Sequence, residues 1–178
     1  MRQEELEQYI REYGKDLYSF CRSVTWNLEE AQDLYQDTFL KLYEIGDRLV
    51  TLNNPKSYLM GIAVNLYRNE KRKLSVRRRI VGVWQSVEEM DTDIPEDARL
   101  LEEEVIAREE CRIVRSAVQS LADKYRLPVL LFYMEELSLS EIASVLRLPE
   151  GTVKSRLYRA KRILQRKLTH NQEGAECG

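Results

Sequence analysis

The sequence predicts an all-α protein made of two small helical domains joined by an acidic linker, with a helix-turn-helix in the second domain. Three observations support this fold class. Apolar residues recur at helical spacing, and no convincing run of strand alternation is present. Charge is segregated along the chain. The 178 residues, 43% hydrophobic and 33% charged, are enough to bury a core and have the composition of a soluble globular protein.

Composition argues against several classes of protein. No apolar run reaches the roughly 18 residues that a membrane helix needs, and the charged N-terminus lacks the apolar centre of a secretory signal. We therefore expect a cytoplasmic protein without membrane insertion. Cys21, Cys111 and Cys177 are far apart and odd in number, which indicates neither a disulfide framework nor a metal site. We expect Cys21 and Cys111 to be buried as small hydrophobic residues.

The segment "NLEEAQDLYQDTFLKLYEIG" predicts an amphipathic helix, with Asn27 as N-cap and Gly46 as its stop. Helical spacing places an apolar set on one side: Leu28, Ala31, Leu34, Tyr35, Phe39, Leu42 and Tyr43. It leaves a polar set for the other side: Asp33, Gln36, Asp37, Lys41 and Glu44. This second face is acidic and polar, as an ordinary solvated face also is.

The next helix is expected to open after "NNP", because Pro55 suits a first helical position, and to run through "KSYLMGIAVNLYRNEKRK". Its second half is strongly basic. Residues 65–80 hold seven Lys or Arg residues against one acid, a net charge of +6. We take residues 1–80 as the first domain.

An acidic segment follows. Residues 88–110 hold eleven acids against two arginines, a net charge of -9. Residues 80–95 lack a clean period and contain Gly82 and Pro95, which is typical of a linker. We place the linker at residues 81–105 and the second domain at residues 106–168, followed by a polar tail, 169–178, that we expect to be disordered.

The second domain is predicted to begin with a long amphipathic helix between Leu101 and Leu121, followed by a shorter one in "KYRLPVLLFYMEE". Pro128 must lie near the first turn of that shorter helix or kink it. Ser138 and Glu141 are spaced as a capping box, so that a helix should begin at "LSEIASVL". "RLP" then ends it, and Pro149 can start the last helix. The last two helices form a helix-turn-helix candidate.

The last helix has two distinct faces at about 100° per residue. Val153, Leu157, Ala160, Leu164 and Leu168 fall within an arc of about 80°, which is suited to packing. Potential hydrogen-bond donors fall within about 140° on the other side: Lys154, Ser155, Tyr158, Arg159 and Arg162. Such side chains can contact base edges and phosphates in a major groove. Residues 147–168 carry a net charge of +7.

Two basic surfaces separated by an acidic segment favour two contacts with a polyanion over two solvated helix faces. The helix-turn-helix also resembles a known family. "LSLSEIASVLRLPEGTVKSRLYRAKRIL" is similar to the C-terminal helix-turn-helix of extracytoplasmic-function sigma factors, although LuxR-type regulators share the general pattern. "AQDLYQDTFLKLYE" resembles the segment of that family that binds core RNA polymerase. "PKSYLMGIAVNLYRNEKRK" resembles its segment for the -10 element. The resemblance extends from Met1 to Leu168.

The resemblance implies a promoter-specificity subunit whose partners are core RNA polymerase, promoter DNA and an anti-sigma factor. It implies polymerase contacts by Asp33, Gln36 and Asp37. It implies contacts with the -10 element by six residues: Tyr58, Asn65, Arg68, Asn69, Lys71 and Arg72. Asn65 would lie in or beside a loop that captures a flipped base. The cations would bind the backbone of the separated strand. It implies -35 duplex contacts by Lys154, Ser155, Tyr158 and Arg159, with Arg162 on phosphate.

The sequence departs from the family pattern at three positions. Tyr58 stands where the family usually has Trp, which bears on any role of this residue in melting. Asn69 occupies a position that is often Asp, and Glu136 one that is often Gly.

Two alternative functions are an autonomous DNA-binding regulator and an enzyme. An autonomous helix-turn-helix regulator would bind duplex DNA unaided and would not need residues 1–79 to resemble a polymerase-binding module. An enzyme is disfavoured, because His170 is the only histidine and neither a phosphate-binding glycine loop nor a metal-ligand spacing is present. We expect no catalytic activity, no metal and no cofactor.

Overall fold

The computed structural model describes residues 3–45, 54–81 and 102–175, and all regular structure within them is helical. This agrees with the predicted all-α class. Contacts divide the chain into two units. The first comprises residues 1–92 with 140–147, and the second comprises residues 93–139 with 148–178. The linker proposed at 81–105 lies mostly outside the described residues.

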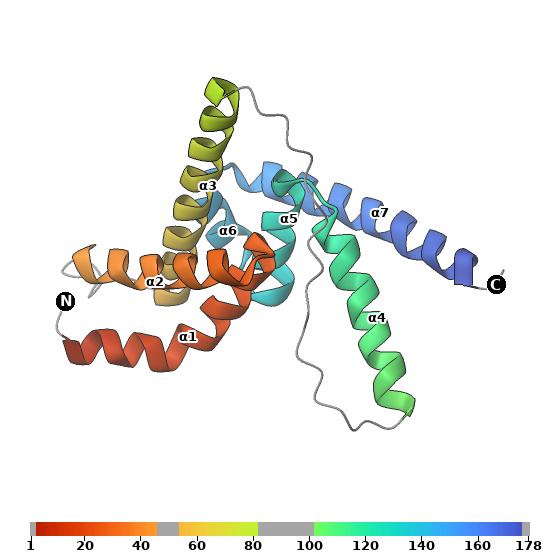
Figure 1. Ribbon diagram of the computed structural model, residues 1–178, viewed down its shortest axis with the longest axis horizontal. Coiled ribbons are helices and arrows are strands. Elements are labelled where there is room, and N and C mark those ends of the chain that lie inside the picture. Colours follow the sequence, from red (N-terminus) through yellow and green to blue (C-terminus); the bar gives the residue numbers. More distant parts are fainter. Residues whose placement is uncertain (1–2, 46–53, 82–101, 176–178) are drawn as a thin grey trace. The chain divides into compact units, whose positions relative to one another are not determined.

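Three helices form the body of the first unit: α1 (Gln3–Thr25), α2 (Leu28–Ile45) and α3 (Pro55–Val81). Each of the three packs against the other two (Figure 1). Their buried side chains form one core, to which the largest contributions come from Leu17, Phe20, Val24, Leu42, Leu59, Met60 and Val64. Each fully buried side chain of this size contributes about 1.5–3 kcal/mol of hydrophobic stabilisation.

The starts of α2 and α3 follow the sequence signals. The Asn27 side-chain oxygen accepts hydrogen bonds from the backbone N–H groups of Glu29 at 2.8 Å and Glu30 at 3.2 Å, so Asn27 is the N-cap that was predicted. Pro55 is the first residue of α3, also as predicted. Asn54 caps α3 by accepting a hydrogen bond from the N–H of Ser57 at 3.0 Å.

Contacts group the short helix α6 (Leu139–Leu146) with this first unit. The helix begins where the capping-box spacing predicted, and it buries Ile142, Ala143, Val145 and Leu146. It ends at Leu146, and the next residue, Arg147, has a φ of 55° in the left-handed region.

The second unit contains α4 (Glu102–Gln119), α5 (Asp123–Val129), the π-helical turn η2 (Leu130–Met134) and α7 (Glu150–Ala175). Both α4 and α5 pack against α7. Leu121, Val129 and Ala160 form the buried cluster between them, and Val118, Tyr125, Leu157, Ile163 and Leu164 pack around it. The buried Arg126 forms an ion pair with Asp123, with 2.6 Å between guanidinium and carboxylate, within the first turns of α5.

The structure decides between two alternatives for Pro128 and corrects one expectation about the tail. Pro128 is the sixth residue of α5 and not part of its first turn, and the wider turn η2 follows it directly. A proline has no N–H to donate to the preceding turn, which favours such a local change of helical winding. The tail expected to be disordered from residue 169 is helical as far as Ala175, because no proline interrupts α7 after Leu168.

Glu136, between η2 and α6, has a φ of 56°. This backbone conformation explains why glycine suits the position, because a side chain with a Cβ is strained there.

We predict that Glu136→Val lowers the free energy of unfolding by about 1–2 kcal/mol, because a β-branched side chain tolerates a positive φ least. Glu136→Gly, as the matched variant, should keep or slightly raise the stability. Urea unfolding followed by circular dichroism measures both. Equal stability of the Val variant and the unmodified chain would contradict the prediction.

Candidate nucleic-acid interface

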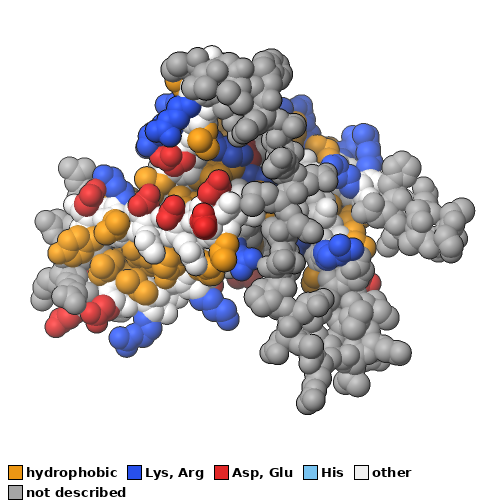
Figure 2. Space-filling view, in the orientation of Figure 1, with side chains coloured by type: hydrophobic (Ala, Val, Ile, Leu, Met, Phe, Trp, Pro, Cys, Tyr) orange, Lys and Arg blue, Asp and Glu red, His pale blue; other side chains and the backbone are white. Residues whose placement is uncertain are grey.

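The acidic face of α2 is exposed. Asp33, Gln36 and Asp37 all lie at the surface, opposite the buried Ala31, Leu34, Thr38 and Leu42. Figure 2 shows acidic side chains in a row along α2, with hydrophobic side chains beside them. The phase of the helix therefore brings the three residues together on one accessible surface, as predicted. Whether they contact a polymerase is a prediction that their exposure does not test.

The apolar side of α2 is narrower than predicted. Leu28 and Tyr43 were assigned to it, yet they are 53% and 51% exposed. Tyr43 lies at one edge of the apolar arc, whereas Leu28 is the first residue of the helix. Leu40 was assigned to neither face, and it is 61% exposed near the middle of the acidic one. Leu40 lies one helical turn after Gln36 and one turn before Glu44. This spacing in the sequence could have identified it as an apolar residue on the acidic face.

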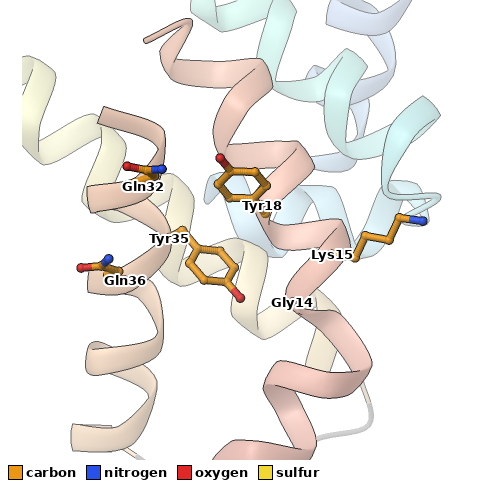
Figure 3. Close-up of a pocket in the computed structure, with 6 residues that line it drawn as sticks. All are labelled: Gly14, Lys15, Tyr18, Gln32, Tyr35 and Gln36. Carbon is orange, nitrogen blue, oxygen red and sulfur yellow. The ribbon is translucent and has the colours of Figure 1, made fainter. Parts of the chain in front are cut away.

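Aromatic packing against α1 sets the orientation of α2. Tyr35 points from α2 toward α1 (Figure 3), and its ring centroid lies 5.6 Å from that of Tyr18 and 5.1 Å from that of Phe39. Burial raises the pKa of Tyr35. A Cβ on Gly14 would lie 3.0 Å from the Tyr35 hydroxyl, so glycine permits this close approach.

An open hollow of about 540 Å³ lies beside this contact. It is lined by Gly14, Lys15 and Tyr18 from α1 and by Gln32, Tyr35 and Gln36 from α2 (Figure 3). The hollow thus reaches the acidic face through Gln36. Its lining offers amide and phenol groups, with one cation on Lys15.

Five of the six residues predicted to contact the -10 element gather on one side of α3, and the sixth, Lys71, lies outside that side. At about 100° per residue, Tyr58, Asn65, Arg68, Asn69 and Arg72 fall within an arc of roughly 100°. Tyr58, Asn65 and Arg68 are partly buried, and the other two are exposed. Asn65 lies inside α3, and not in a loop as one form of the expectation had it. Residues 46–53 before the helix lie outside the described part.

Two of the α3 cations have contacts that restrict them. The Nζ atom of Lys71 lies 5.0 Å from the centroid of the Tyr67 ring, a cation–π contact with a buried aromatic residue. Arg68 donates a hydrogen bond to the backbone carbonyl of Leu146 at 3.2 Å, within the same unit. Arg72, Arg77 and Arg79 are exposed farther along the helix.

The donor face of α7 has the geometry that its sequence predicted. Val153 and Ala160 are fully buried, and Leu157 and Leu164 are partly buried. The five predicted donors are all exposed: Lys154, Ser155, Tyr158, Arg159 and Arg162. Tyr158 is 64% exposed, so its ring and hydroxyl are accessible at the surface. The assignment of these residues to DNA remains a prediction.

Sequence reasoning left out other cations on this surface. Lys161 and Arg166 are exposed on α7, and Lys124 is exposed on α5. The first two could have been found from the helical phase, because their positions fall within or next to the arc of the predicted donors. Lys124 could not, because it lies on another helix.

The described residues hold no group of three or more His, Cys, Asp or Glu side chains that could bind a metal ion. Cys21 is buried, as expected, whereas Cys111 is exposed on α4. The expectation that Cys111 would be buried was wrong, because this part of α4 presents that side to solvent. Within the ranges described, none of the helices combines the length and hydropathy needed to cross a membrane.

Two family models match the chain. Residues 9–77 match Sigma-70 region 2, and residues 111–164 match Sigma-70 region 4. The first match holds the α2 and α3 faces, and the second holds the donor face of α7. The regions named in the resemblance are therefore present, in the expected order.

Two solved structures share the fold. One is a sigma factor RpoE in complex with the anti-sigma factor NepR from Bartonella quintana, with a TM-score of 0.76 and 23% identity, covering 93% of this chain and 97% of that one. The other is CnrH in complex with the cytosolic domain of CnrY, with a TM-score of 0.67 and 22% identity, covering 95% of this chain and 90% of that one.

Characterised relatives are similar over nearly the same length. The sigma factor SigW of Bacillus subtilis is 31% identical over 160 residues, which cover 88% of this chain and 84% of that protein. SigX of the same organism is 25% identical over 156 residues, covering 86% and 78%. The chain therefore belongs to the extracytoplasmic-function sigma factors of RNA polymerase.

Proposed function

We propose that this protein is a promoter-specificity subunit: it binds core RNA polymerase, recognises -10 and -35 promoter elements and promotes DNA melting, without catalysing a reaction of its own. The observation that carries the proposal is the presence of three separate exposed faces in one chain. One is acidic and polar on α2, one is basic and amide-rich on α3, and one is basic on α7. It would act in the cytoplasm, where core polymerase and promoter DNA are found.

Each face suits a different partner. The polymerase would contact α2 through Asp33, Gln36 and Asp37, with the exposed Leu40 adding apolar area in their midst. Separated -10 DNA would contact α3, where amide groups can read an unstacked base and nearby cations can hold its backbone. Duplex -35 DNA would contact α7.

We also propose the domain limits and the control of the protein. Residues 1–80 would form region 2, residues 81–105 an acidic linker, and residues 106–168 region 4. Because a solved structure of the same fold is a complex of a sigma factor with the anti-sigma factor NepR, we propose that an anti-sigma factor restrains this chain as well.

An autonomous regulator is the alternative for a helix-turn-helix protein. It would bind duplex DNA alone and would have no use for the α2 face.

We predict that the purified chain co-elutes with sigma-free bacterial core RNA polymerase on a sizing column, because region 2 presents an accessible acidic surface. Bovine serum albumin, which has no sigma fold, serves as the control and should elute alone. If the chain also elutes alone while still binding duplex DNA, the autonomous regulator becomes the better account.

We predict that Asp33→Arg combined with Asp37→Arg weakens binding to core polymerase by at least about tenfold, because two charges of the wrong sign would enter the interface. A titration of fluorescent chain with polymerase measures the affinity. Glu4→Arg with Glu12→Arg makes the same charge change on α1 and should bind like the unmodified chain. Equal affinity of the α2 variant would remove Asp33 and Asp37 from the interface.

We predict that Arg159→Ala lowers transcription roughly tenfold or more while polymerase binding stays intact, because a bidentate arginine contact with a base is lost. The template is a promoter selected by the unmodified holoenzyme from a random-sequence pool, and run-off transcription gives the rate. Arg115→Ala, an exposed arginine on α4, is the control. Unchanged transcription by Arg159→Ala would overturn the assignment of this residue.

A further inference from the structure

The short helix α6 contacts a helix that belongs to the other family region. By sequence, α6 is the first helix of the predicted helix-turn-helix, and it lies within residues 111–164, which match region 4. By its contacts it belongs to the first unit, together with α3, most of which lies within the region 2 match. Within this unit, α6 therefore joins a region 4 segment to a region 2 helix.

Two contacts join α6 to the first half of α3. The side-chain amide of Asn54, the N-cap of α3, donates a hydrogen bond to the carboxylate of Glu141, which lies in the first turn of α6. Farther along, a Cβ built on Gly61 would lie 3.9 Å from Cγ2 of Val145, an ordinary van der Waals distance. The backbone of α3 at Gly61 is thus close to a buried side chain of α6.

A third contact occupies an arginine that is predicted to bind DNA. Arg68 donates a hydrogen bond to the backbone carbonyl of Leu146, the last residue of α6, at 3.2 Å. The last carbonyls of a helix lack partners within it, and together they carry a partial negative charge. Phosphate oxygens attract arginine in the same way, but with a full charge. The end of α6 thus interacts with Arg68 as a phosphate of the separated strand would.

These contacts fall on the side of α3 that is predicted to bind the -10 strand. Asn54, Gly61 and Arg68 are seven residues apart. At about 100° per residue, each is displaced by only about 20° from the one before, so the three form one stripe along the helix. The stripe lies inside the arc of roughly 100° that holds five of the predicted -10 contacts.

Burial along α3 has the same limits as the stripe. Tyr58 and Asn65 lie within its length and are partly buried, whereas Asn69 and Arg72 lie beyond Arg68 and are exposed. A separated strand that follows this side of α3 would have to contact the stripe where α6 lies. The strand and α6 therefore cannot both occupy it.

We propose that α6 is an internal competitor of the -10 strand: while α6 is docked on the stripe of Asn54, Gly61 and Arg68, the free chain is closed to the strand, and α6 must leave before the strand binds. The inference rests on the proposed function, because it takes this side of α3 as the strand-binding surface. It adds a regulatory contact that lies within the chain and needs no second protein.

The test removes the hydrogen bond between Asn54 and Glu141 in two ways that change the charge in opposite directions. Asn54→Asp keeps an oxygen that can cap α3, removes the donor and places a second carboxylate beside Glu141. Glu141→Ala removes the acceptor and one negative charge. Glu141→Gln makes the same charge change but keeps an oxygen that can accept the hydrogen bond, so it is the matched control.

The probe is a fluorescent single-stranded oligonucleotide with the -10 sequence of a promoter that the unmodified holoenzyme selects from a random-sequence pool. Closure lowers the apparent affinity of the full chain for this probe in the absence of polymerase. Asn54→Asp and Glu141→Ala should each bind it roughly three- to tenfold more tightly than the unmodified chain. Glu141→Gln should stay within about twofold of the unmodified chain. Hydrogen exchange of residues 139–146 should become faster in the two opened variants only.

Two patterns of affinity would overturn the inference. If Asn54→Asp binds the probe more weakly and Glu141→Ala more tightly, the charge of the chain alone explains both results. If neither affinity changes, α6 does not compete with the strand, whether or not its hydrogen exchange becomes faster.

The function on which the inference rests is tested by the holoenzyme. If the unmodified holoenzyme selects no promoter, the proposed function fails, and the inference fails with it. If the holoenzyme binds the probe and no variant of the free chain does, the opened ones included, the proposed function stands and the inference is wrong.

Discussion

Burial of one side of α2 against α1 and α3 determines what the other side can present. Leu34, Thr38 and Leu42 must face the core, because exposing such side chains forgoes about 1.5–3 kcal/mol for each large apolar one. Since helical geometry fixes the angle between residues, Asp33 and Asp37 are then directed outward. The rotation of α2 is held further by Tyr35, whose ring packs between Tyr18 and Phe39. The arrangement of the acidic face therefore depends on the packing of the core. Disrupting that packing would also disrupt the arrangement of the face.

The same relation holds in α7, with different chemistry on the outer face. Val153 and Ala160 are completely buried, and helical geometry then directs Lys154 and Tyr158 into solvent. A long exposed helix with a basic face is stable here because its apolar stripe packs on α4 and α5. Packing and recognition therefore use opposite sides of one helix, which allows the donor residues to vary at little cost to the fold.

Left-handed residues at helix ends mark where the chain changes direction. Trp26, Glu136 and Arg147 all have positive φ values, between 55° and 64°, and each directly precedes or follows a helix boundary within two residues. None of them is glycine, so each position stores some backbone strain. Packing of the neighbouring helices has to offset this strain. The strained turns persist because they set the directions of the helices that follow them.

The sequence by itself determined the helices and their local signals. Asn27, Pro55 and the start of α6 were identified correctly, because caps and helical period depend on neighbours within a few residues. The polar faces of α2 and α7 followed from the same local phase. Tertiary structure decided what local patterns do not contain. Tyr43 and Cys111 are exposed in the structure, because burial depends on which side chains the neighbouring helices cover, and a local sequence pattern does not contain that information. It also brought Leu121 and Val129 together with Ala160 in one buried cluster, which exists only because α5 packs on α7.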